Sequence, residues 1–290
     1  MDVFLQLTLS GLSTGMIYAL AAAGFVVIYK ASDVINFAQG DFLLLGTYLL
    51  FFSVVQLGLP TSLGVLLTVL GAVAAALLIE RLVLRPLIGE PVISTIMVTI
   101  GLSSVLRGLV HAVWGVSPRS IDSVLPTGTT AIGPVTLSTA RLLIVPIALA
   151  VLAALWLFFR HTRDGLAMRA IADDRQAALS LGINIPGVFG LAWGLAAAAA
   201  AIGGIMLGSI VGVTPNVATI GLRVFPVVIL GGLDSIRGAV VGGATIGLLE
   251  AYAGGYLGRG LNLVLPYAVL VLVLMLRPYG IFGRVEIERV

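Results

Sequence analysis

The stretch RHTRDGLAMRAIADDRQAALSLGINIP, residues 160–186, is the most polar part of a chain that is otherwise dominated by apolar residues. Seven charged side chains fall within its first sixteen positions, and long apolar runs lie on both sides of it. Charged side chains are rare and costly in the hydrocarbon core of a bilayer. We therefore expect this stretch to leave the membrane between two spans.

The composition of the whole chain is typical of an integral membrane protein. Of its 290 residues, 59% are hydrophobic and 10% are charged, whereas soluble domains carry about 25% charged residues. At about 20 residues per helical span, the length allows about eight spans, within a range of roughly seven to nine. We predict an all-α transmembrane bundle, with some broken or re-entrant helices, that forms a single domain over residues 1–290.

Several classes of function are disfavoured by what the sequence lacks. It has no cysteine and two histidines, and it contains neither the HExxH motif of zinc proteases nor the GxxxxGK[ST] motif of ATP-binding proteins. The pattern GxSxG occurs as GLSTG at residues 11–15, but it lies inside the first apolar run and not at the strand-to-helix turn that forms the nucleophile elbow of a serine hydrolase. We therefore expect no enzyme, no metal site and no cofactor in this chain. The net charge of +3 comes from arginines spread over several loops, so we expect it to set membrane orientation and not to bind nucleic acid.

Apolar runs that end at charged, glycine or proline residues give the predicted spans. These are residues 5–29, 36–56, 61–80, 92–114, 142–159, 185–211 and 261–276. Residues 225–250 contain two short apolar halves around a polar turn, which is typical of a helical hairpin. A hairpin that crosses the membrane fully gives nine spans, and a re-entrant one gives seven. The glycine pairs at 203–204, 231–232 and 242–243 are predicted to be helix-packing sites.

The distribution of arginine and lysine predicts the orientation, because positive residues are enriched in cytoplasmic loops. Residues 160–175 hold four, the tail after residue 276 holds three, and residues 80–90 hold two. Residues 115–140 hold one, and their proline, glycine, serine and threonine content indicates a loop with a short helix or hairpin. We place 160–186, 80–90 and the C-terminus in the cytoplasm, and 115–140 and the N-terminus outside.

The segment INFAQGD, residues 35–41, places polar side chains at the start of the second span. Polar groups persist inside membranes where they line a cavity or cap a broken helix, whose amino end can attract a polar solute. We take Asn36, Phe37, Gln39 and Asp41 as candidate residues of a translocation pathway. The alternative is an ordinary start of the span at the membrane interface, with the acidic residues at the water line.

Arg107 and Glu250 are the most deeply embedded charges of the apolar runs. They can pair inside the bundle. We favour instead a position of Glu250 at the outer interface, with the Arg107 side chain extended toward the membrane surface. His111 is interpreted as a satisfied histidine of the interior or interface and not as a ligand.

The second half of the opening stretch has the signals of a short helix outside the bilayer. Acidic residues at 173–174 suit a first helical turn, and Gly182 follows as a C-terminal stop. The sequence therefore predicts one helix over residues 173–181, with the small residues Ala177 and Ala178 on its surface. The alternative is a surface helix that only connects two spans.

Several motifs together carry a family resemblance. The alanine pair 177–178, followed by Gly182 and Pro186, resembles the coupling segment of ABC-transporter permeases. The segments INFAQGDF at 35–42, RAIADDRQAALSLGIN at 169–184 and GGLDSIRGAVVGG at 231–243 strengthen it. From about residue 5 to 283, the chain resembles the branched-chain amino acid permease family of bacterial ABC importers, the shorter of the two permease types.

The resemblance implies a multi-pass permease of the bacterial inner membrane that carries branched-chain or related small amino acids, or amide-like solutes. Its implied partners are a second homologous permease, two cytoplasmic subunits that bind ATP, and an extracytoplasmic solute-binding protein. The helix at 173–181 is then expected to sit in a groove of one ATPase. The coupling residues so implied are Asp173, Asp174, Arg175, Ala177, Ala178, Leu181 and Gly182.

The alternative to an ATP-driven importer is a stand-alone secondary transporter or channel for a small polar solute. Secondary transporters often contain symmetric repeats and embedded coupling charges. Residues 35–50 and 229–250 are only weakly alike, and embedded charges are few. We therefore favour the importer.

Overall fold

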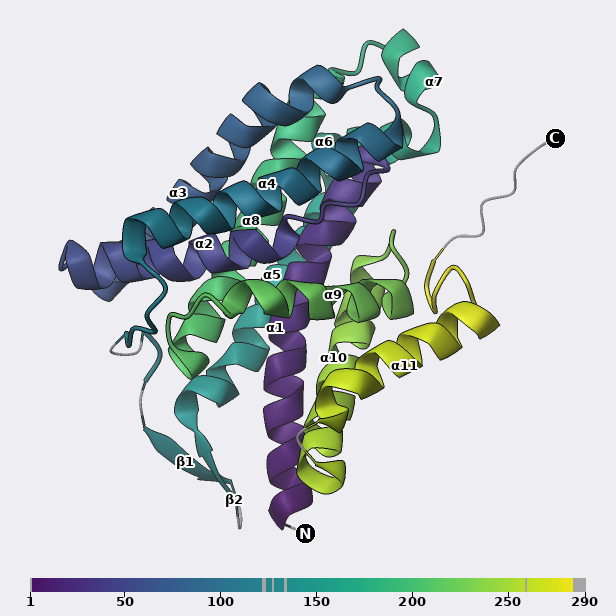
Figure 1. Cartoon of the computed structure of the whole chain (residues 1–290). Coiled ribbons are helices and arrows are strands. Elements are labelled where there is room, and N and C mark those ends of the chain that lie inside the picture. Colours follow the sequence, from purple (N-terminus) through teal and green to yellow (C-terminus); the bar gives the residue numbers. More distant parts are fainter. Residues whose placement is uncertain (1, 122–123, 127, 133–134, 259, 284–290) are drawn as a thin grey trace.

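A computed structural model describes residues 2–121, 124–126, 128–132, 135–258 and 260–283 (Figure 1). The α-helices are α1 (Asp2–Ser32), α2 (Gln39–Phe51), α3 (Thr61–Ile79), α4 (Val92–Trp114), α5 (Thr139–His161), α6 (Arg163–Asp173), α7 (Arg175–Ser180), α8 (Ile185–Val211), α9 (Val217–Gly231), α10 (Ile236–Tyr252) and α11 (Leu261–Leu276). Short π-helical or 3-10 segments extend some of them: η1 (Phe52–Gln56), η2 (Glu80–Leu84), η3 (Arg85–Leu87) and η4 (Ala253–Leu257). Strands β1 (Thr129–Ile132) and β2 (Val135–Ser138) pair antiparallel.

Six helical segments of the described chain are long and apolar enough to cross a membrane, which confirms the predicted polytopic bundle. They are α1, α2 with η1, α3 with η2 and η3, α4, α5 and α8. Helices α9 and α10 meet at a bend of 118°, so the predicted helical hairpin is a broken or re-entrant element. Two predicted spans, 92–114 and 261–276, coincide with α4 and α11.

Proline and glycine residues set boundaries between the spans, as the sequence predicted. Pro60 and Pro91 directly precede α3 and α4, with backbone angles outside the helical region. Proline suits the start of a helix because the first backbone N–H groups of a helix have no partner within it, so the missing N–H of proline costs no hydrogen bond there. Gly58 has a φ of 63°, a left-handed conformation that glycine adopts without steric cost.

Helix α1 runs through the centre of the bundle and packs against α10, α8, α5 and α9 (Figure 1). Its residues 16–23 are at most 2% exposed. A Cβ placed on Gly243 of α10 would lie 2.8 Å from the Cβ of Ala19, and one placed on Gly11 would lie 2.8 Å from the carbonyl oxygen of Gly247. Membrane helices associate through such close packing of small residues, so the seam between α1 and α10 holds the centre of the fold.

A second close seam joins α2 to α8. A Cβ on Gly46 would lie 2.6 Å from the Cα of Ala201, and the Thr47 hydroxyl donates to the carbonyl oxygen of Gly204 at 2.9 Å. The predicted packing role of the glycine pairs is confirmed at Gly204, Gly231, Gly242 and Gly243, where a Cβ would meet the backbone of a neighbouring helix. Gly232 instead approaches the backbone of Gly283 after α11, and a Cβ at Gly203 would make only ordinary contacts, at 3.7 Å or more.

Helix α7 and the hairpin β1–β2 lie at opposite ends of the bundle, with the N-terminus at the hairpin end (Figure 1). The two polar segments of the sequence, 160–186 and 115–140, therefore leave the bundle in opposite directions, as expected from the arginine distribution. The hairpin expected in the second segment is also present. Arg119 anchors this segment to the end of α8, since its backbone exchanges two hydrogen bonds of 2.9 Å with Val213.

We expect Gly15→Ala to destabilise the protein, because the added methyl group would meet the backbone of Gly243 across the α1–α10 seam. Overpacking of this kind costs about 1–3 kcal/mol. The matched control is Gly101→Ala on α4, where no atom lies within 4 Å of the added Cβ. Thermal unfolding in one detergent should show a lower melting temperature for Gly15→Ala alone. Equal melting temperatures would contradict the tight seam.

Candidate translocation face and coupling helix

Two buried amide side chains hold the break between α1 and α2 inside the bundle. The Asn36 Oδ1 atom accepts from the backbone nitrogen of Ala38 at 3.0 Å, and its Nδ2 donates to Oε1 of Gln39 at 3.2 Å. Gln39 donates in turn from Nε2 to the carbonyl oxygen of Ala196 on α8 at 3.3 Å. Asn36 and Gln39, two of the four predicted pathway residues, are thus hydrogen-bonded within the protein. They supply hydrogen bonds that an interrupted helix lacks.

Phe37 connects the start of α2 to two other helices. Its backbone nitrogen donates to Oγ1 of Thr99 on α4 at 3.2 Å. Its ring lies 5.1 Å from the ring of Phe225 on α9, centroid to centroid. The side chain is partly exposed, so among the predicted pathway residues Phe37 is the one that reaches the protein surface.

Asp41, in the first turn of α2, is fully buried and forms an ion pair with Arg107 of α4. The Nε atom of Arg107 donates to Oδ1 of Asp41 at 2.7 Å, while the Arg107 side chain remains 39% exposed. The interpretation that Arg107 extends toward the membrane surface did not include this ion pair, which holds the guanidinium against Asp41 while part of the side chain stays exposed. The sequence does not show this pair, because Asp41 and Arg107 meet only once α2 and α4 have packed.

Glu250 forms a second embedded ion pair, with Arg223 of α9. Its Oε2 atom also accepts from the hydroxyl of Tyr18 on α1 at 2.8 Å, and its side chain is 11% exposed. Glu250 is thus largely buried and bonded to two other helices. The alternative prediction that it pairs with Arg107 is wrong, since the charged residue that α9 brings against α10 is Arg223.

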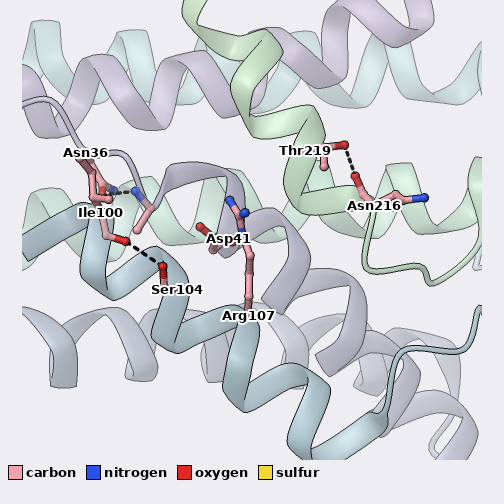
Figure 2. Close-up of polar contacts among 8 residues, drawn as sticks. Asn36, Asp41, Ile100, Ser104, Arg107, Asn216 and Thr219 are labelled. Carbon is pink, nitrogen blue, oxygen red and sulfur yellow. Dashed lines mark hydrogen bonds and ion pairs between the residues drawn. The ribbon is translucent and has the colours of Figure 1, made fainter.

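Exposed polar side chains lie beside the first ion pair on what we call the polar face. It consists of Ser104 and Arg107 on α4 with Asn216 and Thr219 at the amino end of α9. Figure 2 shows these residues on either side of the first turns of α2. Helix α2 positions both sets, because Asp41 binds Arg107 and the backbones of Gly40 and Gly221 are in contact.

The hydroxyls of Ser104 and Thr219 donate to the backbone oxygens of Ile100 and Asn216 at 3.5 and 2.7 Å. The Arg107 guanidinium and the Asn216 amide are poorly suited to lipid tails, because hydrocarbon offers no hydrogen bonds. Gly101 and Gly108 lie on the same side of α4, and no atom lies within 4 Å of a Cβ position at either residue. The face is therefore open as well as polar, and it suits a water-filled path or a partner subunit. Sequence reasoning missed it, although polar residues three positions apart within an apolar helix are the signal that finds such a face.

The predicted helix over 173–181 is in fact divided between two helices. Helix α6 ends at Asp173, and Asp174 leaves the helical conformation with φ −158° and ψ 108°. The Asp174 Oδ1 atom then accepts from the backbone nitrogens of Gln176 and Ala177 at 2.8 and 2.9 Å. Aspartate is a strong N-cap, and this capping bond starts a new helix instead of continuing the old one.

Helix α7 ends at the predicted glycine stop but presents a different surface from the one predicted. Gly182 has a φ of 78°, and the backbone nitrogen of Ile183 donates back to the carbonyl oxygen of Ala178 at 3.1 Å. Ala178 is 1% exposed and packs inward, whereas Leu179 and Leu181 are 55% and 80% exposed. The outward surface of this segment is therefore apolar and leucine-rich, with Ala177 and Gln176 beside the leucines.

Helix α7 contacts the bundle at α8, and a cavity lies beside the neighbouring helix α6. The guanidinium of Arg175 lies 5.8 Å from the ring centre of Phe189 on α8. Beside α6 lies a cavity of about 560 Å³, lined by Arg169 and Asp173 of α6, by Lys30 at the end of α1 and by Asp234 in the α9–α10 turn. The connection therefore has one packed side, against α8, and one hollow side lined by charges of both signs.

Known proteins resemble the chain over almost its whole length. A family model described as "Branched-chain amino acid transport system / permease component" matches residues 7–274. The high-affinity branched-chain amino acid transport system permease protein LivH of Escherichia coli strain K12 is 34% identical over 307 residues, which cover 99% of this chain and 98% of that protein. The corresponding permease protein BraD of Pseudomonas aeruginosa is 33% identical over 301 residues, with the same two coverages. A probable LivH permease of Methanocaldococcus jannaschii is 28% identical over 278 residues, covering 91% of this chain and 88% of that protein.

We expect Glu250→Leu to lower the free energy of unfolding by about 3–5 kcal/mol, because it leaves the Arg223 charge without its partner inside the bundle. The double variant Glu250→Leu with Arg223→Leu should recover most of this loss, since both charges are then removed. Denaturant titration of the wild-type protein, both single variants and the double variant measures the coupling. Additive losses in the double variant would contradict the pair.

Proposed function

The chain belongs to the family of permease components of branched-chain amino acid transport systems, and on that basis we propose that it is a membrane subunit of an ATP-driven importer. The proposed solutes are branched-chain amino acids and related small amino acids or amide-like compounds. The observation that carries the proposal is the full-length similarity to permeases whose names state this solute class. The multi-pass bundle with an open polar face and a protruding short helix supports it.

The polar face is the proposed wall of the translocation pathway. A single chain leaves this face open, so a second, homologous permease would supply the opposite wall. Asn36 and Gln39 would position this wall and not contact the solute, since their hydrogen bonds fix the start of α2 against α8. Phe37 and Arg107 are more exposed than the buried Asn36, Gln39 and Asp41, and they would contact the solute.

Helix α7 is the proposed contact with one of two ATPase subunits, which would bind and hydrolyse the ATP. Leu179 and Leu181 offer an apolar surface that costs free energy in water and is typical of an interface core. The Asp174 cap and the Arg175–Phe189 contact make the segment a defined body and not a loose loop. A push on α7 would therefore reach α8 directly and α1 through α6.

The proposed orientation places α7 and the C-terminus in the cytoplasm of a bacterium, with the hairpin β1–β2 outside the inner membrane. The hairpin end would then receive a solute-binding protein. Four arginines at the α7 end of the chain, within residues 160–175, support this orientation.

Reconstitution tests the function. The chain is co-expressed with its neighbouring permease, ATPase and solute-binding genes, and the purified complex is inserted into proteoliposomes. We expect uptake of labelled leucine that requires internal ATP and the solute-binding protein. Uptake by this chain alone, driven by an ion gradient, would show a secondary transporter and overturn the proposal.

We expect Leu181→Glu to weaken binding of the ATPase subunit by about tenfold or more, because a charge would replace an apolar interface anchor. The residue is 80% exposed, so the stability of the permease itself should change little. Leu166→Glu on α6 is the matched control, since this leucine is 59% exposed but lies outside α7. The measurement is the amount of ATPase that co-purifies, together with ATP-driven uptake. Equal losses in both variants would contradict a contact centred on α7.

A further inference from the structure

Arg107 is a charged residue within the span α4, between residues 92 and 114. A guanidinium at such a position is costly, and charges inside membrane spans usually belong to a functional site. The buried carboxylate of Asp41 offsets part of this cost and fixes the side chain by the 2.7 Å bond to Nε. The position of the guanidinium is therefore set before any solute arrives.

The bond to Asp41 occupies one edge of the guanidinium. Among the described residues, no hydrogen bond or ion pair of Arg107 involves its two Nη atoms, and the side chain is 39% exposed. Two N–H groups side by side form a fork that matches the two oxygens of a carboxylate. Arg223 differs, because its Nη1 atom already donates to both Glu250 and Tyr18.

The surroundings of this free edge have the properties of a solute site. Ser104 precedes Arg107 by one helical turn on α4, and Thr219 and Asn216 lie across the start of α2 (Figure 2). Gly108 follows Arg107 on α4 and has no side chain, and no atom of the described residues beyond its chain neighbours lies within 4 Å of its Cβ position, so the helix surface next to Arg107 is open. The site therefore combines a fixed cation with hydroxyl and amide groups and with room for a small molecule.

Asp41 also limits how tightly an anion can bind. The ion pair has no net charge, so a carboxylate that reaches Arg107 meets a guanidinium that is already partly neutralised. A transport pathway needs this balance, because binding must be strong enough for entry and weak enough for release.

From these observations we propose that Arg107 binds the carboxylate of the α-amino acid that passes along the polar face, with Asp41 as its positioning residue. The inference rests on the proposed function and adds the group that recognises the shared part of all α-amino acids. Discrimination between apolar side chains is left to other contacts and to the solute-binding protein.

Cysteine protection tests the proposal in the assembled complex. The chain contains no cysteine, so Ser104→Cys introduces one reactive thiol in this chain, one turn from Arg107. An anionic thiosulfonate reagent then measures access to the polar face, with native cysteines of the other subunits replaced. We expect leucine to slow the modification, and leucinamide, which lacks the carboxylate, not to do so.

The same thiol is then combined with changes at the ion pair. Adding Arg107→Gln should raise the leucine concentration for half-protection by about tenfold or more, the loss expected for a charge-assisted hydrogen bond. Because Arg107→Gln leaves Asp41 unpaired, the double change Arg107→Gln with Asp41→Asn provides a neutral variant with similar side-chain volumes, and it should lose protection equally. Asp41→Asn alone keeps an oxygen that can accept from Nε of Arg107 but removes the neutralising charge, so half-protection should need less leucine than in the Ser104→Cys background.

Three results would overturn the proposal. Protection by leucine that is unchanged in both Gln variants would show that the carboxylate binds elsewhere. Equal protection by leucine and leucinamide would show that the carboxylate is not recognised. Loss of the second permease from both Gln variants on purification would assign Arg107 to assembly. Failure of the proposed function is separate, because it appears as absent leucine uptake in the wild-type complex.

Discussion

The core of a bilayer holds no water to satisfy polar groups, and this constraint organises the whole chain. It accounts for the long helices, which bond their own backbone, and for the places where a helix can be interrupted. Helix α2 starts inside the bundle because Asn36 and Gln39 supply hydrogen bonds there and because Thr99 of α4 accepts from the backbone of Phe37. The polar INFAQGD segment is therefore in the first place a device for beginning a helix within the membrane.

The same constraint gives meaning to the polar groups that remain open. The ion pairs of Arg107 and Arg223 illustrate the difference. Arg223 is engaged by Glu250 and Tyr18, and this network ties α9 to α10 and α1 in the interior. Arg107 is engaged on one edge and open on the other, next to Ser104 and opposite the amino end of α9. Arg223 therefore links helices of the bundle, and Arg107 leaves part of its guanidinium available for a molecule outside the chain.

The α7 end and the polar face are linked through rigid packing. Phe189 of α8 lies against Arg175 of α7. Farther along α8, backbone carbonyl oxygens accept hydrogen bonds from the side chains of Gln39 and Thr47 on α2. A displacement at α7 would thus arrive at the helix that positions Asp41 and Arg107. The glycine and alanine contacts along these helices leave little space for the motion to be absorbed by side chains. This continuity gives a physical basis for the proposed coupling between ATP hydrolysis in a partner and access to the proposed pathway.

The sequence by itself placed six membrane-length helices, their breaks and the polar segments at the two ends of the bundle, although it predicted about eight spans where the described chain has six, or up to seven with the bent pair α9–α10. Hydropathy and the position of proline are local properties, so α4 and α11 were predicted to the residue. Only the tertiary structure decided which helices are neighbours. Asp41 with Arg107 and Glu250 with Arg223 each join residues far apart in the chain, and hydropathy carries no record of such pairings. The direction of Ala178 and the outward position of Leu181 were also beyond the sequence, because the cap at Asp174 turned α7 relative to α6. Local energies therefore fix where each helix lies along the chain, while packing between distant helices fixes which of their polar groups are buried and which remain open to a solute.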